Sequence, residues 1–139
     1  MALRLSLDTT FLIDLQRERS RREPEDGAAH RFLRRSPDAR LFLSAVALAE
    51  FAEGFVTVEH PVVRAVREQH QLLPIDEETS LIYAGIVREL RGRGRLIGSN
   101  DLWIGAASLR FGLPLVTADV EHFQRIEGLE VIGYRADDP

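Results

Sequence analysis

The sequence contains no cysteine and no lysine, and it has one methionine and one tryptophan. Without cysteine the protein has no disulfide, no thiolate zinc site and no cysteine nucleophile. No apolar run reaches the roughly 18 residues that a membrane-spanning helix needs. The opening MALRLSLDTT also lacks the basic region and the long apolar region of a secretory signal. We therefore expect a cytoplasmic protein.

Arginine supplies all 18 basic residues, and the formal net charge is −4. An acidic chain, taken as a whole, does not indicate a nucleic-acid-binding protein. The exclusive use of arginine has two explanations that can hold together. One is a genome rich in G and C, and the other is a need for the bidentate contacts that arginine makes with phosphate.

Short apolar segments with the character of strands alternate with segments of helical period. Strands are expected at 3–7, 41–43, 72–75 (a strand or a connector), 114–117 and 130–134, and helices at 10–17, 28–35, 45–56, 61–71, 77–91 and 100–111, with a turn or short helix at 120–124. The charged segment 18–27 is expected to be a solvated loop. The expected N-caps are Thr9 or Thr10, Ser44 and Asp76. This alternation predicts an α/β fold, with a mostly parallel central sheet flanked by helices, in a single domain over residues 1–139.

Four acidic residues stand alone in apolar or small-residue segments that are far apart in the sequence. Asp8 and Asp119 follow two expected strands, and Glu50 and Asp101 lie in early turns of two expected helices. Strand carboxyl ends and the helix N-termini that follow them share one edge of a parallel sheet, so the four acids are expected to converge there. Two carboxylates about 5 Å apart repel by roughly 3 kcal/mol at an effective dielectric constant of about 20. A divalent cation bound between them turns this net repulsion into a net attraction.

The expected cation is Mg²⁺ or Mn²⁺, because the candidate ligands are oxygen atoms and the four histidines do not have the spacing of a zinc motif. Such a centre predicts an enzyme that cleaves phosphodiester bonds. Each acid alone also fits a structural role. Asp8 could cap a helix, Asp101 could stabilise a helix N-terminus, Asp119 could belong to an ordinary turn, and Glu50 could face solvent.

Four motifs occur in an order that resembles a known family. They are LDTTFLIDL, SAVALAEFAEG, GRLIGSNDLWIGAAS and LPLVTADVEHFQRIEGLEVI. Together they resemble the PIN-domain ribonucleases, and specifically the VapC-type toxins of bacterial toxin–antitoxin pairs. The resemblance covers nearly the whole chain, with Gly105 at a position where alanine is more usual.

The resemblance implies an endoribonuclease that depends on Mg²⁺ or Mn²⁺ and cuts structured RNA such as tRNA or rRNA, which inhibits translation. It also implies a homodimer that is neutralised by a VapB-type antitoxin. The catalytic and metal-binding positions of the family fall on Asp8, Glu50, Asp101 and Asp119.

Neutral and basic residues near the four acids are further candidates for a role in the site or in RNA binding. Thr9, Asn100 and Thr117 could orient the acids, although helix capping and turn formation would explain them equally well. Four arginines could follow an RNA backbone, or they could only form a solvated helix end: Arg88, Arg91, Arg93 and Arg95.

Two other functions compete with this interpretation. A non-catalytic PIN-like module that binds RNA or protein would be expected to lack one or more of the acids, and all four are present. A phosphatase of the haloacid dehalogenase type needs Asp-x-Asp-x-Thr after its first strand. Here the segment is Asp8-Thr9-Thr10, so the second acid is missing and this function is rejected.

Overall fold

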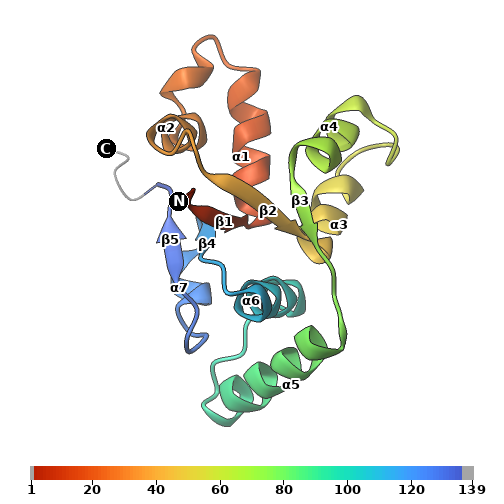
Figure 1. The fold of residues 1–139 in the computed structure, drawn as a ribbon, viewed down its shortest axis with the longest axis vertical. Helices are drawn as coiled ribbons and strands as arrows, with labels where there is room; N and C mark the ends of the chain where they lie inside the picture. Colours follow the sequence, from red (N-terminus) through yellow and green to blue (C-terminus); the bar gives the residue numbers. More distant parts are fainter. Residues whose placement is uncertain (1, 136–139) are drawn as a thin grey trace.

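A five-stranded sheet, parallel throughout, forms the centre of the protein (Figure 1). The computed structural model describes residues 2–135. The strand order is β3-β2-β1-β4-β5, and the bounds are β1 Arg4–Leu7, β2 Arg40–Ser44, β3 Gln71–Leu73, β4 Leu115–Thr117 and β5 Val131–Gly133. The chain therefore extends the sheet to one side of β1 and then returns to the other side. In sheets of this kind, ligands bind at the point where successive strands switch from one side of the first strand to the other, which here is between the carboxyl ends of β1 and β4.

Helices cover both faces of this sheet. Their bounds are α1 Thr9–Arg19, α2 Ala28–Arg35, α3 Ala45–Glu53, α4 Pro61–Gln69, α5 Glu77–Gly92, α6 Ser99–Phe111 and α7 Val120–Phe123, with a short 3₁₀ helix, η1, at Pro24–Asp26. In Figure 1, α1 and α2 lie above the sheet, and the packed pair α5 and α6 lies below it. This arrangement confirms the α/β fold that the sequence predicts. Within residues 2–135, no helix is both long and apolar enough to span a membrane.

The register of the central strands places their ends in one row. Leu7 of β1 is aligned with Leu43 of β2 and with Val116 of β4. The side chains of these three residues have no exposed surface, which is usual for parallel strands that are buried on both faces. The residues that follow this row therefore emerge together at the carboxyl edge of the sheet.

Most helix boundaries agree with the sequence pattern, and the caps are partly different. Ser44 caps α3 by accepting a hydrogen bond from the backbone N–H of Ala47, and Asp76 caps α5 in the same way, as predicted. The prediction that Thr9 or Thr10 caps α1 was wrong, because the side chain of Asp8 accepts the hydrogen bond of the first N–H. Helix α3 ends at Glu53, earlier than the expected residue 56, and Gly54 is its C-cap.

The segment 18–27, predicted to be a solvated loop, contains a buried acid. Glu18 belongs to the last turn of α1 and is only 3% exposed. Its carboxylate accepts hydrogen bonds from the backbone N–H groups of Ala29 and His30, at 3.0 and 2.9 Å, and lies 2.7 Å from the His30 ring. It thus caps the N-terminus of α2 from another helix. Gly27 makes room for this contact, since a Cβ there would lie 2.0 Å from the Glu18 carboxyl carbon.

The glycine at position 105 also has a packing reason. Gly105 lies in the buried helix α6, and a Cβ at this position would be 2.5 Å from Cδ1 of Ile126. The missing methyl group lets the segment after α7 lie directly against α6. This contact matters for the candidate active site described below, because α6 carries Asp101 and α7 carries His122.

Candidate active site

Asp8 lies at the end of β1 and is the most enclosed of the four acids, with 2% of its surface exposed. Oδ1 accepts a hydrogen bond from the backbone N–H of Thr9 at 2.8 Å. Oδ2 accepts hydrogen bonds from the hydroxyls of Thr10, at 2.9 Å, and Thr117, at 2.7 Å. Burial raises the pKa of the Asp8 carboxyl, and the charge of Glu50 adds to that effect, while the three hydrogen bonds oppose it. Across residues 2–135, no cationic side chain forms an ion pair with Asp8.

Glu50 on α3 is held between two other helices. Its Oε1 accepts a hydrogen bond from the hydroxyl of Thr9 at 2.7 Å, and its Oε2 accepts one from the side-chain amide of Asn100 at 3.0 Å. Thr9 begins α1 and Asn100 lies in the first turn of α6, so these bonds join three helix ends at the edge of the sheet.

The three neutral residues singled out in the sequence all contact the acids. Thr9 and Asn100 bind Glu50, and Thr117 binds Asp8. Thr117 also accepts a hydrogen bond from the backbone N–H of Asp119, at 2.9 Å, which fixes the turn after β4. Whether these contacts serve catalysis stays a prediction.

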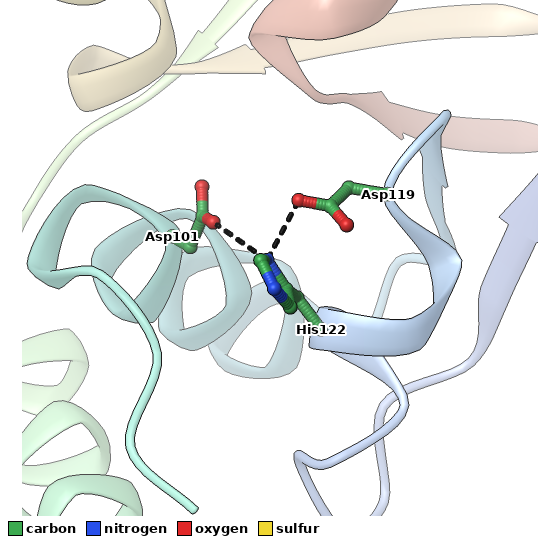
Figure 2. A group of neighbouring side chains, drawn as sticks. All are labelled: Asp101, Asp119 and His122. Carbon is green, nitrogen blue, oxygen red and sulfur yellow. Dashed lines mark ion pairs between the residues drawn. The ribbon is translucent and has the colours of Figure 1, made fainter.

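Asp101 and Asp119 meet around a histidine that the sequence analysis missed. Figure 2 shows the His122 ring between the two carboxylates. Nδ1 of His122 lies 2.7 Å from Oδ2 of Asp119 and 3.9 Å from Oδ2 of Asp101. One donor atom from each of the three residues lies within 4.8 Å of the others. The sequence offered one signal, the i, i+3 spacing of Asp119 and His122. The contact with Asp101 depends on how α7 packs on α6.

The charges of the other three acids act on Asp101. Burial and the negative charges of Asp8, Glu50 and Asp119 raise the pKa of Asp101 from 3.8 to about 6, and His122 opposes them. The expected approach of the acids is thus present, since Asp101 lies close enough to the other three for their charges to act on it, but the group of donor atoms within 4.8 Å of one another in residues 2–135 is Asp101, Asp119 and His122, without Asp8 or Glu50. The capping role that we had set against this interpretation is also present, because Asp8 both caps α1 and faces the other acids.

These residues fit a divalent cation. Carboxylate oxygens dominate the donor set, and one imidazole nitrogen, Nδ1 of His122, is within reach of Asp101 and Asp119. Such a cluster has an excess of negative charge at the ends of buried elements. A cation of charge +2 would offset this repulsion.

Basic residues lie beside this cluster, on the loop between α5 and α6 and on the segment after α7. Arg93, Arg95 and Arg125 line a surface hollow of about 270 Å³ together with Glu121 and Gln124. Arg93 is paired with Glu89 at 3.1 Å, so part of its charge is already compensated.

The fold and the site together define a class, namely small α/β proteins with a cluster of acidic residues at the carboxyl edge of a parallel sheet. The chain belongs to the PIN domain family, whose sequence profile matches residues 5–129. This finding confirms the family that the four sequence motifs predict.

The relatives within this family are ribonucleases by name. The chain is 32% identical over 129 residues to Ribonuclease VapC1 of Haemophilus influenzae strain R2866, which covers 89% of this chain and 92% of that protein. It is 29% identical over 131 residues to Ribonuclease VapC1 of Methanocaldococcus jannaschii, covering 92% of this chain and 86% of that one. Among solved structures, VapBC-1 from nontypeable Haemophilus influenzae superposes with a TM-score of 0.77 at 31% identity, covering 95% of this chain and 98% of the other.

Proposed function

We propose that this protein is a ribonuclease toxin of the VapC type and that a VapB-type antitoxin neutralises it. Identity above 30% over nearly the whole chain supports this proposal, because the relatives are VapC ribonucleases and the similar solved structure is a VapBC complex. The observation that carries it is the convergence of Asp8, Glu50, Asp101 and Asp119 from four segments. A scaffold with no chemistry to perform would not need four acids that repel one another.

The cofactor of the proposed reaction is Mg²⁺ or Mn²⁺, held directly or through water by these four acids. When bound, the cation would stabilise the negative charge that develops on the phosphate during cleavage. Asp8 is suited to a fixed ligand, because three hydrogen bonds set its orientation. Glu50 is oriented by Thr9 and Asn100 in the same manner.

The proposed substrate is RNA, with tRNA or rRNA as the target class, and cleavage would inhibit translation in the cytoplasm. Arg95 is the best placed residue for a phosphate contact, since it lines the hollow beside α7, where Arg93 and Arg125 are already paired with Glu89 and Glu121. Arginine at such positions would grip the backbone of the RNA without reading its sequence. We further propose that residues 1–139 form one PIN domain and that two copies form the active dimer.

The test is cleavage of labelled tRNA and rRNA fragments by the purified protein with Mn²⁺, with Mg²⁺ and with excess EDTA. We expect cuts with either metal, none with EDTA, and at least a 100-fold loss in Asp8→Asn, the order of magnitude of losing a group that stabilises transition-state charge. Asp38→Asn, which changes an exposed acid of the turn before β2, is the matched control. Full activity of Asp8→Asn would refute the assignment of the site. Metal binding without cleavage of any RNA would favour a non-catalytic binding module.

A further inference from the structure

His122 stands in the site without a role in the reaction as proposed so far. Its side chain is 45% exposed, but its Nδ1 atom is shielded from solvent and points between the two acids. The distance from Nδ1 to Asp119 Oδ2 is 2.7 Å, yet the two atoms are not aligned for a hydrogen bond, and Nδ1 has no such bond within residues 2–135. A ring held only for structural reasons would be expected to use this nitrogen in an aligned bond.

The backbone around His122 is fixed by its neighbours. Phe123, the next residue, is fully buried in the core, and Gln124 donates a backbone hydrogen bond to Val120 at 2.9 Å. The guanidinium of Arg125 reaches back to the backbone carbonyls of the loop before α6. The backbone that carries the imidazole is therefore held in place, and the side chains of Phe123 and Ile126 lie against Gly105 of α6.

We propose that His122 is a nitrogen ligand of the divalent cation and that it gives the site a preference for Mn²⁺ over Mg²⁺. This inference rests on the proposed metal-dependent function. Neighbouring ligands in an octahedral site with bonds of about 2.1 Å lie about 3 Å apart, which is close to the spacing of Nδ1 and the Asp119 oxygen. Both ions bind carboxylates well, but Mn²⁺ accepts an imidazole nitrogen more readily than Mg²⁺ does, because Mg²⁺ selects oxygen ligands and keeps several waters.

A sequence interpretation restricted to the acids predicts an all-oxygen site that treats the two metals alike. The structure replaces it with a mixed site, in which one ligand discriminates between them. Substitution of His122 should therefore change Mn²⁺ affinity far more than Mg²⁺ affinity, while substitution of an acid should weaken both.

The experiment measures metal binding directly, on the full-length protein with no RNA present. Calorimetry with MnCl₂ and with MgCl₂ gives the two dissociation constants for the wild type, for His122→Gln and for Asp101→Asn. Pulsed electron paramagnetic resonance of the Mn²⁺ complex reports whether a ¹⁴N nucleus of imidazole is coupled to the metal. His60→Gln is the control, because that histidine caps α4 and lies on another helix. Thermal unfolding of each variant shows whether it is folded.

We expect an imidazole ¹⁴N coupling in the wild type and in His60→Gln, and its disappearance in His122→Gln. Mn²⁺ binding should weaken about tenfold or more in His122→Gln, with Mg²⁺ binding changed by less than about threefold. Mn²⁺ bound without any ¹⁴N coupling, or unchanged selectivity in a folded His122→Gln protein, would overturn the inference and leave the proposed nuclease intact. Failure of the wild type to bind either metal would overturn both.

Discussion

Replacing Asp101 by asparagine should make the metal-free protein more stable. The pKa of this carboxyl is about 6 in the folded protein instead of 3.8, because it is buried and faces the charges of Asp8, Glu50 and Asp119. At neutral pH the folded protein must therefore hold an ionised group that the fold disfavours. At about 1.4 kcal/mol per pKa unit, the interval from 3.8 to about 6 corresponds to about 3 kcal/mol.

The size of the effect measured should be below that limit. The Asp101 side chain is 26% exposed, so solvent screens part of the repulsion. Asparagine has nearly the same shape and removes the charge. We expect Asp101→Asn to raise the free energy of unfolding by about 1 to 3 kcal/mol at pH 7.5 in the presence of EDTA. Urea unfolding followed by circular dichroism measures this difference, with Asp38→Asn as the control for a remote acid.

The pH dependence supplies a second check with a definite sign. A carboxyl with a raised pKa binds more protons in the folded state, so its unfavourable effect grows as the pH rises from about 4 to about 6 and is complete above that range. The stability difference between Asp101→Asn and the wild type should thus be largest above pH 6 and vanish below about pH 4. Saturating Mn²⁺ should reverse the order, because the metal stabilises the wild type through the same carboxylates. Equal or lower stability of the asparagine variant at pH 7.5 without metal would contradict the picture of four repelling acids.

Three further predictions concern groups around the site and the α1–α2 connection. Glu18→Ala should lower the free energy of unfolding by roughly 1 to 3 kcal/mol in urea unfolding, because it leaves the backbone donors of Ala29 and His30 unpaired. Burial raises the pKa of Glu18, but hydrogen bonds from His30 and Ala29 outweigh burial and lower the pKa below 4.5. The stability that Glu18 contributes should therefore be present above pH 4.5 and decline below it. If the variant lost stability below pH 4.5 to the same extent as the wild type, this prediction would be refuted. Gly27→Ala should cause a similar loss of stability by displacing the Glu18 carboxylate. The double variant should be about as stable as the less stable single variant, because both changes remove the same contact. Additive losses of unfolding free energy would show that the two residues act independently. Thr117→Val removes a hydrogen bond to Asp8 and one from Asp119, and should weaken Mn²⁺ binding in calorimetry by about tenfold, with unaltered binding as the contrary result.

The sequence predicted the parallel sheet and the meeting of the four acids because both follow from local patterns. Apolar strands bounded by turns reveal the sheet, and an acid directly after such a strand lies at its carboxyl edge by geometry alone. Local patterns could not predict that Glu18 is buried. Its partners are the N–H groups of Ala29 and His30, which become available only when α2 folds back on α1. Charged composition therefore indicated a solvated loop where the fold buries a hydrogen-bonded acid.

His122 was missed for a related reason. Histidine spacing was compared with zinc motifs, in which the ligands lie close together in the sequence, whereas its second carboxylate, Asp101, belongs to another helix. The contact requires α7 to approach α6 closely, and Gly105 permits that approach by leaving space for Ile126. Gly105, in the middle of a buried helix, was noted as a departure from the family pattern, and its missing side chain leaves room for Cδ1 of Ile126.

The structural and functional roles of Asp8 turn out to depend on each other. As the N-cap of α1, its carboxylate is held by the Thr9 N–H and directed toward the edge of the sheet. The same orientation presents it to Glu50, whose charge raises the pKa of Asp8, and to Asp101, whose pKa is raised by the charge of Asp8. A residue that only capped the helix would be exposed and replaceable by serine at a cost of a few tenths of a kcal/mol to about 1 kcal/mol. Burial of an acid without an ionic partner is unfavourable for folding alone, which favours the proposed site, in which a bound cation would supply the positive charge.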